Sequence, residues 1–383
     1  MVSNEQQIIE IDIATRIVGD EEDMYVVRPG ASFSLYADFQ RENAVFLDFP
    51  DLPFSLEQKP KFTPIVREIV TRSIAIRDWH LGKLSSEPSR EQSAYVGAAI
   101  GRRVGAYIGA IQRLYYDLPI GTVIVIPGKT YIDDVAFAEI TGPTERRKAA
   151  KAYPDEYMLV RPVRWLAWKQ KASLSPELRT TLGQPTPVMQ IGRSLRDEIL
   201  KVAFKQYVFK GVNSTKITTT AKDFSIVDDF NIQRFNNYIS GLLAAEESHI
   251  ADGVTVNLSE ALRLLRDRRD LVPELDQSIS SPGFQRLYSE HISPLVIGAL
   301  MTAALSGTAI AQTTEIRVKN SAMMANDVCA VQVQERVQGS MRIAHFSEFL
   351  DMCAALKETQ QATGLKTSMT AKERKGQTKA TKK

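Results

Sequence analysis

The sequence has few of the residues that build metal centres, disulfide frameworks and nucleophilic active sites. Its 383 residues include two cysteines and four histidines, which are Cys329, Cys353, His80, His249, His291 and His345. The cysteines lack metal-type spacing, no histidines stand in an H-x-x-x-H or H-E-x-x-H pattern, and there is no Gly-x-Ser-x-Gly motif. The first residues also lack the basic and apolar regions of a signal peptide. We therefore expect no disulfide, metal, cofactor or catalytic residue, and a cytoplasmic location.

Long uncharged stretches are rare as well, with one exception at residues 292–314, ISPLVIGALMTAALSGTAIAQTT. This stretch is long enough to cross a bilayer. However, Pro294 and several serines and threonines dilute it, and flanking aromatic and basic anchors are poor. Two interpretations stay open: contact with a membrane through residues 292–312, or a buried central helix followed by a turn and a strand.

A strong excess of one charge is absent from most of the chain. The net charge is +3, and the segment from Lys357 to Lys383, with eight basic and two acidic side chains, alone carries +6, so the remainder is −3. The Lys/Thr/Gln-rich composition of residues 357–383 predicts a disordered basic tail. Any affinity of the body for nucleic acid must come from a local patch.

The sequence is most informative between residues 118 and 168. Three apolar runs rich in Val, Ile, Phe and Trp (118–128, 134–143 and 157–168) are separated by Gly, Pro and charged clusters. That pattern predicts three strands of a small sheet or barrel. Two earlier runs, 24–28 and 44–49, predict further strands.

Short motifs occur in a fixed order along this part of the chain. They are Tyr25–Gly30, Ala44–Phe49, Ile124–Pro127, Glu139–Gly142, Arg161–Leu166 (RPVRWL), Leu174–Leu178 and Leu182–Gly183. In this order they resemble the N-terminal domain of Mrr-type restriction proteins, a small barrel of the PUA/EVE group of base-reading domains. The resemblance covers roughly residues 24–192.

The resemblance also implies a binding site. In PUA-like domains a cleft between strands holds a nucleobase by aromatic stacking and by hydrogen bonds to its edge. By position it implicates Arg28, Asp48, Phe49 and Trp165 in the cleft. The basic residues expected to meet phosphates are Lys129, Arg146, Arg147, Arg161 and Arg164.

The role of Trp165 stays open at this stage. Alternation along a straight strand places Trp165 on the face of Val163 and Ala167, and places Trp168 on the opposite face. Trp165 could therefore equally be core. The chain also departs from the family at Thr144, where relatives carry an aromatic residue, which leaves the stacking partner of the base undetermined.

The sequence predicts an α+β chain of two domains. A PUA-like β-barrel with a helical insertion at 60–117 occupies residues 1–192, and a helix-rich α+β domain ending in a small sheet occupies 193–356. Within the insertion, helices are expected at 64–79 and 93–116. In the second domain, helices are expected at 192–210, 226–246, 258–271, 283–291 and 345–356, strands at 314–319 and 328–337, and a polar linker at 211–222.

The order expected for residues 280–356 faintly resembles a degenerate nuclease domain of the PD-(D/E)xK class. Such domains need metal-binding carboxylates and a lysine that polarises water. Here Gln334 stands where the lysine would be, and the carboxylates on offer are Glu315 and Asp327. The comparison therefore argues against an enzyme, although a diverged metal-dependent nuclease stays an alternative.

Taken together, these patterns predict a protein that recognises DNA or RNA in a bacterial restriction or phage-defence system. The alternative is a structural or membrane-associated subunit of a defence complex, whose barrel binds a protein partner.

Overall fold

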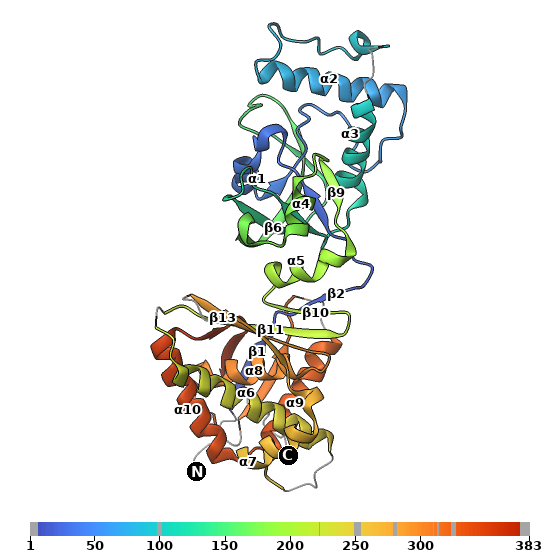
Figure 1. The fold of residues 1–383 in the computed structure, drawn as a ribbon. Coiled ribbons are helices and arrows are strands. Elements are labelled where there is room, and N and C mark those ends of the chain that lie inside the picture. Colours follow the sequence, from blue (N-terminus) through green and yellow to red (C-terminus); the bar gives the residue numbers. More distant parts are fainter. Residues whose placement is uncertain are drawn as a thin grey trace, which may run out of the picture. The chain divides into compact units, whose positions relative to one another are not determined.

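The computed structural model describes residues 7–97, 102–221, 223–248, 254–278, 282–308, 310–311, 314–322 and 327–375. The chain is a mixed α+β protein, as predicted. It divides into two compact units: unit 1 comprises Met1–Asp20 and Lys205–Lys383, and unit 2 comprises Glu21–Phe204. Figure 1 shows the elements of each unit.

Unit 1 joins the two ends of the chain. Its strands are β1 (Gln7–Asp12), β2 (Arg16–Val18), β10 (Gln206–Phe209), β11 (Val212–Thr219), β12 (Glu274–Ser278), β13 (Gly283–Ser289), β14 (Glu315–Lys319), β15 (Lys366–Thr367) and β16 (Thr370–Lys375). Its helices are α6 (Ile226–Glu247), α7 (Leu258–Asp267), α8 (Ser293–Leu305), α9 (Val328–Ile343) and α10 (Phe346–Thr363).

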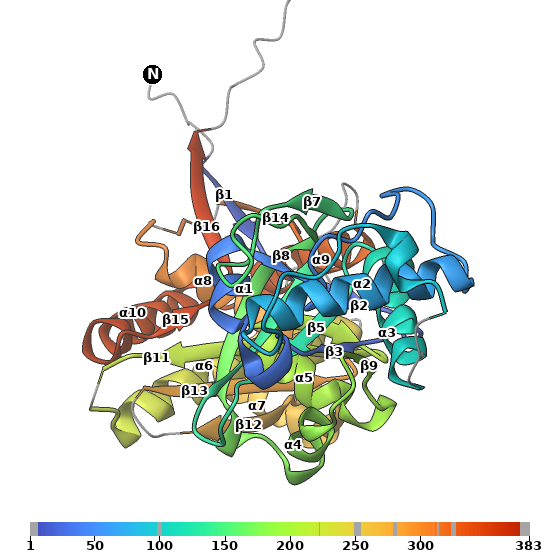
Figure 2. The ribbon, with the colours of Figure 1, turned by 90° about the horizontal axis from the view of Figure 1, so that it is seen from above.

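Strand pairing explains why the N-terminal residues belong to unit 1 and not, as predicted, to the barrel domain. Strand β1 pairs in parallel with β14 and antiparallel with β16, and β2 pairs in parallel with β10. Figure 2 shows β1 and β16 side by side. The remaining strands follow the order β12-β13-β11-β10-β2, with β15 paired to β11.

The structure corrects the prediction that residues 357–383 are disordered. Helix α10 continues to Thr363 and ends at Gly364, whose φ of +64° is the left-handed C-cap conformation that glycine favours. Leu365 and Met369 are then buried in the core of unit 1, and β16 completes a sheet edge. Residues 376–383 lie outside the described residues.

Four further segments of unit 1 differ from the prediction. Residues 206–209, at the end of the helix expected at 192–210, form strand β10. Residues 212–219, within the expected linker, form β11, because threonine and isoleucine favour strands. Residues 283–289 form β13 instead of a helix. Residues 328–343 form helix α9 instead of a strand: Cys329, Val333 and Val337, four residues apart, all face the core.

Helix α8 accounts for most of the uncharged stretch. Its residues 293–304 are all buried within unit 1, where they pack against α6, α9 and β11. The buried-helix interpretation is therefore the one observed. No helix in the described ranges combines the length and apolarity needed to span a membrane.

Unit 2 is built on a sheet that curls into a half-barrel. Its strands are β3 (Tyr25–Val27), β4 (Ala44–Val45), β5 (Val123–Ile126), β6 (Asp134–Ile140), β7 (Glu145–Arg147), β8 (Met158–Gln170) and β9 (Val188–Gln190). Its helices are α1 (Tyr36–Glu42), α2 (Pro64–His80), α3 (Arg102–Gln112), α4 (Pro176–Gly183) and α5 (Arg196–Ala203). The strand order is β4-β8-β6-β5-β3-β9, with β7 paired to β8.

The insertion contains two helices, as predicted, but the second begins later than expected: residues 92–95 form a 3-10 turn, α3 starts at Arg102, and residues 98–101 lie outside the described residues. Helix α2 begins after the N-cap Thr63, whose side chain accepts from the Val66 N–H, and it has proline in its first turn. Helix α3 continues into a single π-helical turn, Arg113–Asp117. The two helices pack together (Figure 1). Because both approach the segment that follows β4, they can contribute side chains to the same region as the sheet.

A β-bulge in β8 changes the faces of its tryptophans. Ala138 is opposite Trp165 and Phe137 is opposite Ala167, so Leu166 is the extra residue. After the bulge the alternation is reset, and Trp165 and Trp168 lie on the same face of the strand, with ring centroids 5.8 Å apart. The prediction from straight-strand alternation, which placed them on opposite faces, is therefore wrong.

Candidate functional site

Unit 2 contains a cavity of about 280 Å³. It is lined by Arg28, Gly30, Ala31, Ser32, Leu47, Asp48, Phe49, Arg77, Tyr107, Pro185 and Pro187. These residues come from the loop after β3, the segment after β4, helices α2 and α3, and the loop before β9. The volume lies just below the usual range for ligand sites and suits one small ring system.

Arg28 forms one polar side of the cavity. Its Nη1 donates to the carbonyl oxygens of Leu182 (3.1 Å) and Gln184 (2.6 Å) at the end of α4. Its guanidinium carbon lies 4.8 Å from the ring centroid of Phe33. Burial lowers the pKa of Arg28, but an arginine remains charged at neutral pH. These contacts hold one guanidinium nitrogen and fix the group at the cavity wall.

Asp48 is the acidic group of the cavity. Its carboxylate is buried and accepts from the backbone N–H of Ala31 (3.2 Å) and from the hydroxyl of Tyr153. Burial, and then the charge of Asp48, raise the pKa of Tyr153, which therefore stays a hydrogen-bond donor. A carboxylate has about four lone-pair positions, so these two donors leave capacity for a ligand.

The loop that Asp48 holds has an unusual backbone. Gly30 has a φ of +74°, and Ser32 and Phe33 have φ values of +54° and +63°. Left-handed conformations of residues other than glycine are uncommon and tend to occur at functional sites. The loop turns sharply enough for its backbone to form part of the cavity wall.

Arg77 provides a second guanidinium from α2. Its Nε and Nη2 donate to one carboxylate oxygen of Asp78, at 3.1 and 2.9 Å. Burial acts to lower the pKa of Arg77, but the bonds to Asp78 and the charge of Asp48 outweigh it and raise the pKa. The cavity therefore brings two guanidinium groups and one carboxylate to its polar lining.

The apolar lining is largely aromatic. The rings of Phe49 and Tyr107 are 5.0 Å apart between centroids and tilted by 59°. Pro185 and Pro187 add rigid apolar surface, and the Pro187 carbonyl accepts from the Arg28 N–H at 2.9 Å. A flat ligand could contact these rings while its edge meets the charged groups.

The structure brings together three of the predicted cleft residues, Arg28, Asp48 and Phe49, around one cavity. Trp165 is not among its lining residues. Instead, it packs partly against the core of unit 2, and its Nε1 donates to Asn43 Oδ1 at 3.0 Å. Of the two roles that the sequence left open for Trp165, the structure therefore supports partial packing against the core and does not place the residue in this cavity.

Three of the predicted phosphate-binding arginines are bound to backbone carbonyls. Arg161 is buried and donates to the carbonyls of Leu114, Leu118 and Gly142. Arg146 and Arg147 also bond backbone carbonyls, those of Leu52 and Phe54 for the first and of Glu42 for the second. We therefore do not retain Arg161 as a phosphate ligand. Lys129 and Arg164 are exposed, and Arg164 pairs with Glu139.

Sequence reasoning missed Arg77, Tyr107 and the two prolines. Arg77 and Tyr107 belong to the helical insertion, for which the resemblance gave no counterpart. Tyr107 lies between Gly105 and Gly109, and that glycine spacing was interpreted as close packing alone. The ring of Phe62 does lie 3.5 Å from the position of a Cβ added at Gly105, whereas Gly109 has open space. The signal that could have pointed to Tyr107 was an aromatic residue placed between two glycines on the same helix.

Beneath Asp48 a second polar group is built around Glu156. Its carboxylate is 2.7 Å from Arg90 and 3.3 Å from His80 Nε2, and the His80 ring contacts Tyr153 edge-on. Burial acts to raise the pKa of Glu156, but the bonds from Arg90 and His80 outweigh it, and the pKa is lowered. The ionised Glu156 therefore stabilises the fold fully at pH values above its ordinary, unfolded-state pKa. This stabilisation is lost as the pH falls through the lower pKa of the folded state.

Replacing Glu156 with glutamine should lower the free energy of unfolding by roughly 1 to 2 kcal/mol at pH 7. The variant should also lose less stability than the wild type between pH 5 and pH 3, because it lacks the carboxylate that titrates. Urea unfolding followed across this range measures both effects. Glu87→Gln is the matched control, since Glu87 is exposed and contacts the same Arg90. An equally steep acid loss in wild type and Glu156→Gln would contradict the assignment.

The residues compared with a nuclease site take other positions. Gln334 lies on helix α9, not on a strand, and its side chain accepts from the Val318 N–H at 3.1 Å. Glu315 pairs with Arg317, and Asp327 caps α9. In the part of the chain that the structure describes, no three His, Cys, Asp or Glu side chains are grouped as a metal site. Burial raises the pKa of both cysteines to about 12.

Comparison with models of protein families, with curated proteins and with solved structures finds no match. The resemblance to the Mrr-type domain therefore stays a prediction, and the cavity itself carries the functional argument.

Proposed function

We propose that unit 2 binds nucleic acid, DNA or RNA, by taking one base into the cavity. The observation that carries this proposal is the composition of a cavity of about 280 Å³: the aromatic rings of Phe49 and Tyr107 together with a buried carboxylate and two guanidinium groups. Aromatic rings bind any base by its flat face. Charged groups at the edge add hydrogen bonds that differ from base to base.

The charged lining favours a base whose edge both donates and accepts. The Asp48 carboxylate accepts from an amino group, such as that of cytosine, and guanidinium groups donate to base carbonyl and ring-nitrogen acceptors. Cytosine and guanine carry an amino group beside a carbonyl. Adenine lacks the carbonyl, and thymine and uracil lack the amino group. We therefore propose cytosine or guanine, unmodified or modified, as the base in the cavity.

The biological setting follows from the resemblance alone. A reader of this kind would serve restriction or phage defence, with unit 1 as an assembly platform or signal relay. Oligonucleotides that contain modified bases test this setting once binding to ordinary bases is established.

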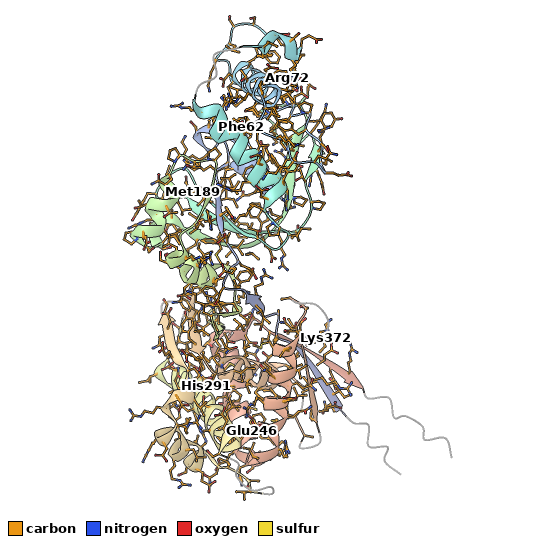
Figure 3. The ribbon with its side chains drawn as sticks, turned by 90° about the vertical axis from the view of Figure 1, so that its right-hand side faces the viewer. Phe62, Arg72, Met189, Glu246, His291 and Lys372 are labelled. Atoms are coloured by element: carbon orange, nitrogen blue, oxygen red, sulfur yellow. The ribbon has the colours of Figure 1, made fainter. Side chains whose placement is uncertain are left out.

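Binding of fluorescent single-stranded DNA and RNA to the full chain, at low and physiological salt, tests the proposal. Phe49→Leu should weaken binding about tenfold through the lost ring contact. Phe62→Leu is the matched control, because Phe62 (Figure 3) is an exposed ring outside the cavity lining. Equal affinities for wild type and Phe49→Leu, with both proteins folded, would count against the cavity as the site.

A protein partner is the second candidate, favoured by one feature of unit 1. Ile226, Val227 and Phe230, in the first turns of α6, are all highly exposed. Apolar side chains gathered in this way often mark interaction sites. Absence of nucleic-acid binding by the folded wild type would move the assignment to this candidate.

A further inference from the structure

We propose that a second surface of unit 2 binds the nucleotides next to the base held in the cavity, so that the ligand is single-stranded nucleic acid. This surface, called here the flanking strip, comprises Lys129, Tyr131, Trp165, Trp168, Lys171 and Arg179. The inference rests on the proposed function of the cavity. None of the residues in the flanking strip lines the cavity.

The aromatic members of the flanking strip leave ring surface open to solvent. Tyr131 is 57% exposed and Trp168 is 46% exposed, although large aromatic side chains usually lie mostly buried. Trp165 lies beside Trp168, with their ring planes tilted by 34°. The bulge at Leu166 creates this arrangement by placing both tryptophans on one face. Such open rings are the stacking platforms that single-stranded nucleic-acid binders use.

These rings are held in place before any ligand arrives. The guanidinium carbon of Arg179 lies 5.2 Å from the Tyr131 ring centroid, and Arg179 also bonds the Tyr131 hydroxyl. Trp165 is fixed by its hydrogen bond to Asn43. A preorganised platform loses little side-chain freedom when it binds, which favours affinity.

Two members of the flanking strip lie near the cavity, Arg179 on α4 and Lys171 at the end of β8. Arg28 of the cavity bonds the carbonyl of Leu182, and Arg179 lies three residues earlier on the same helix. Lys171 follows β8, and its N–H donates to the carbonyl of Asp133 at 3.0 Å. The Gln170 side chain bonds the carbonyl of Ile132, which joins the loop carrying Tyr131 to the strand carrying Trp168.

The charge of the flanking strip suits a phosphate backbone. Burial, and then the positive charge of Arg28, lower the pKa of Lys171, and the charge of Asp133 partly offsets them, so Lys171 lies near both groups. Lys129 is exposed in the neighbouring loop. The acidic groups of this loop are Asp133 and Asp134, and the Asp133 carboxylate already accepts from the Thr130 N–H at 2.6 Å. Cations interleaved with open rings fit a single strand, whereas a duplex hides the faces of its bases.

The experiment compares one nucleotide with a short strand on the full chain. Affinities are measured at physiological salt for cytidine and guanosine monophosphate, and for single-stranded pentanucleotides with the same base at the centre. We expect Tyr131→Ala and Trp168→Ala each to weaken pentanucleotide binding roughly fivefold to a hundredfold, and to leave mononucleotide binding unchanged. Tyr157→Ala, which removes another exposed ring of unit 2, should change neither affinity.

Three results would overturn the inference. Pentanucleotides that bind no more tightly than mononucleotides, or that bind the two variants as tightly as the wild type, would show that the cavity acts without the flanking strip. A wild type that binds neither probe would instead refute the proposed function of the cavity. A double strand that binds better than the single strand would refute the assignment of the ligand.

Discussion

Replacing Arg161 with methionine should lower the free energy of unfolding of unit 2 by at least about 3 kcal/mol. The Arg161 side chain is 3% exposed and donates to the carbonyls of Leu114 (3.0 Å), Leu118 (3.0 Å) and Gly142 (3.1 Å). Methionine fills similar space but cannot donate. The substitution therefore leaves several buried carbonyls without a hydrogen-bond donor, and each unsatisfied buried group costs about 1–3 kcal/mol.

Tryptophan fluorescence during urea unfolding measures this effect in unit 2 alone. The three tryptophans of the chain, Trp79, Trp165 and Trp168, all lie in that unit. Lys169→Met is the matched control on the same strand: its side chain is exposed, and a substitution at such a surface position changes stability by about 0.5 kcal/mol or less. If Arg161→Met proved as stable as Lys169→Met, the carbonyl contacts would not be holding β8 to the π-helical turn.

Arg161 also illustrates what residue type and spacing leave undecided. Arginines beside tryptophans on a strand are compatible with phosphate binding and with internal hydrogen bonding. The choice depends on whether backbone carbonyls from distant segments converge on the side chain. Here those carbonyls belong to the π-helical turn (Leu114), to its C-cap (Leu118) and to the turn after β6 (Gly142), an arrangement that exists only after the insertion has packed on the sheet.

Five strands of unit 2 could be predicted because their apolar runs are short and bounded by glycine and proline, whereas β7 and β9, each three residues long, were not predicted. The same reasoning failed at β13 and α9. The apolar residues of 283–289 and 328–343 are compatible both with the 3.6-residue repeat of a helix and with the two-residue repeat of a strand. The pairing of β1 with β16 was also beyond local patterns: Gln7 is opposite Lys375, and no local signal relates positions so far apart. Tertiary context decided all three.

The residues of the candidate site also fall into two groups, those that local sequence patterns could identify and those that depend on tertiary packing. Arg28 follows β3 directly, and Asp48 and Phe49 lie within four residues of the end of β4, so a resemblance based on strand order could find them. Arg77 and Tyr107 enter from helices of the insertion, and their contribution depends on how those helices pack. The shared face of Trp165 and Trp168 depends on a single extra residue in β8, and the sequence contains no proline or glycine at Leu166 to mark the bulge.

Replacing Asp48 with asparagine should remove most of the preference for cytosine and guanine. The carboxylate accepts only, whereas the amide that replaces it has one acceptor oxygen and an NH₂ group that donates. Asp48 already receives the Tyr153 hydroxyl and the Ala31 N–H, and asparagine cannot serve these two and a base amino group as well. We expect about a tenfold loss of affinity for cytidine and guanosine monophosphate, with a smaller change for thymidine monophosphate.

Competition of the four nucleoside monophosphates against a fluorescent oligonucleotide measures the preference, and tryptophan fluorescence checks that the variant is folded. Asp51→Asn provides the matched control: Asp51 lies on the same segment but pairs with Arg72 at 2.9 Å and does not line the cavity. A folded Asp48→Asn variant that discriminates between bases as well as the wild type would show that the carboxylate does not read the edge. The two guanidinium groups of Arg28 and Arg77 would then carry the selectivity, because they are the other charged groups in the lining.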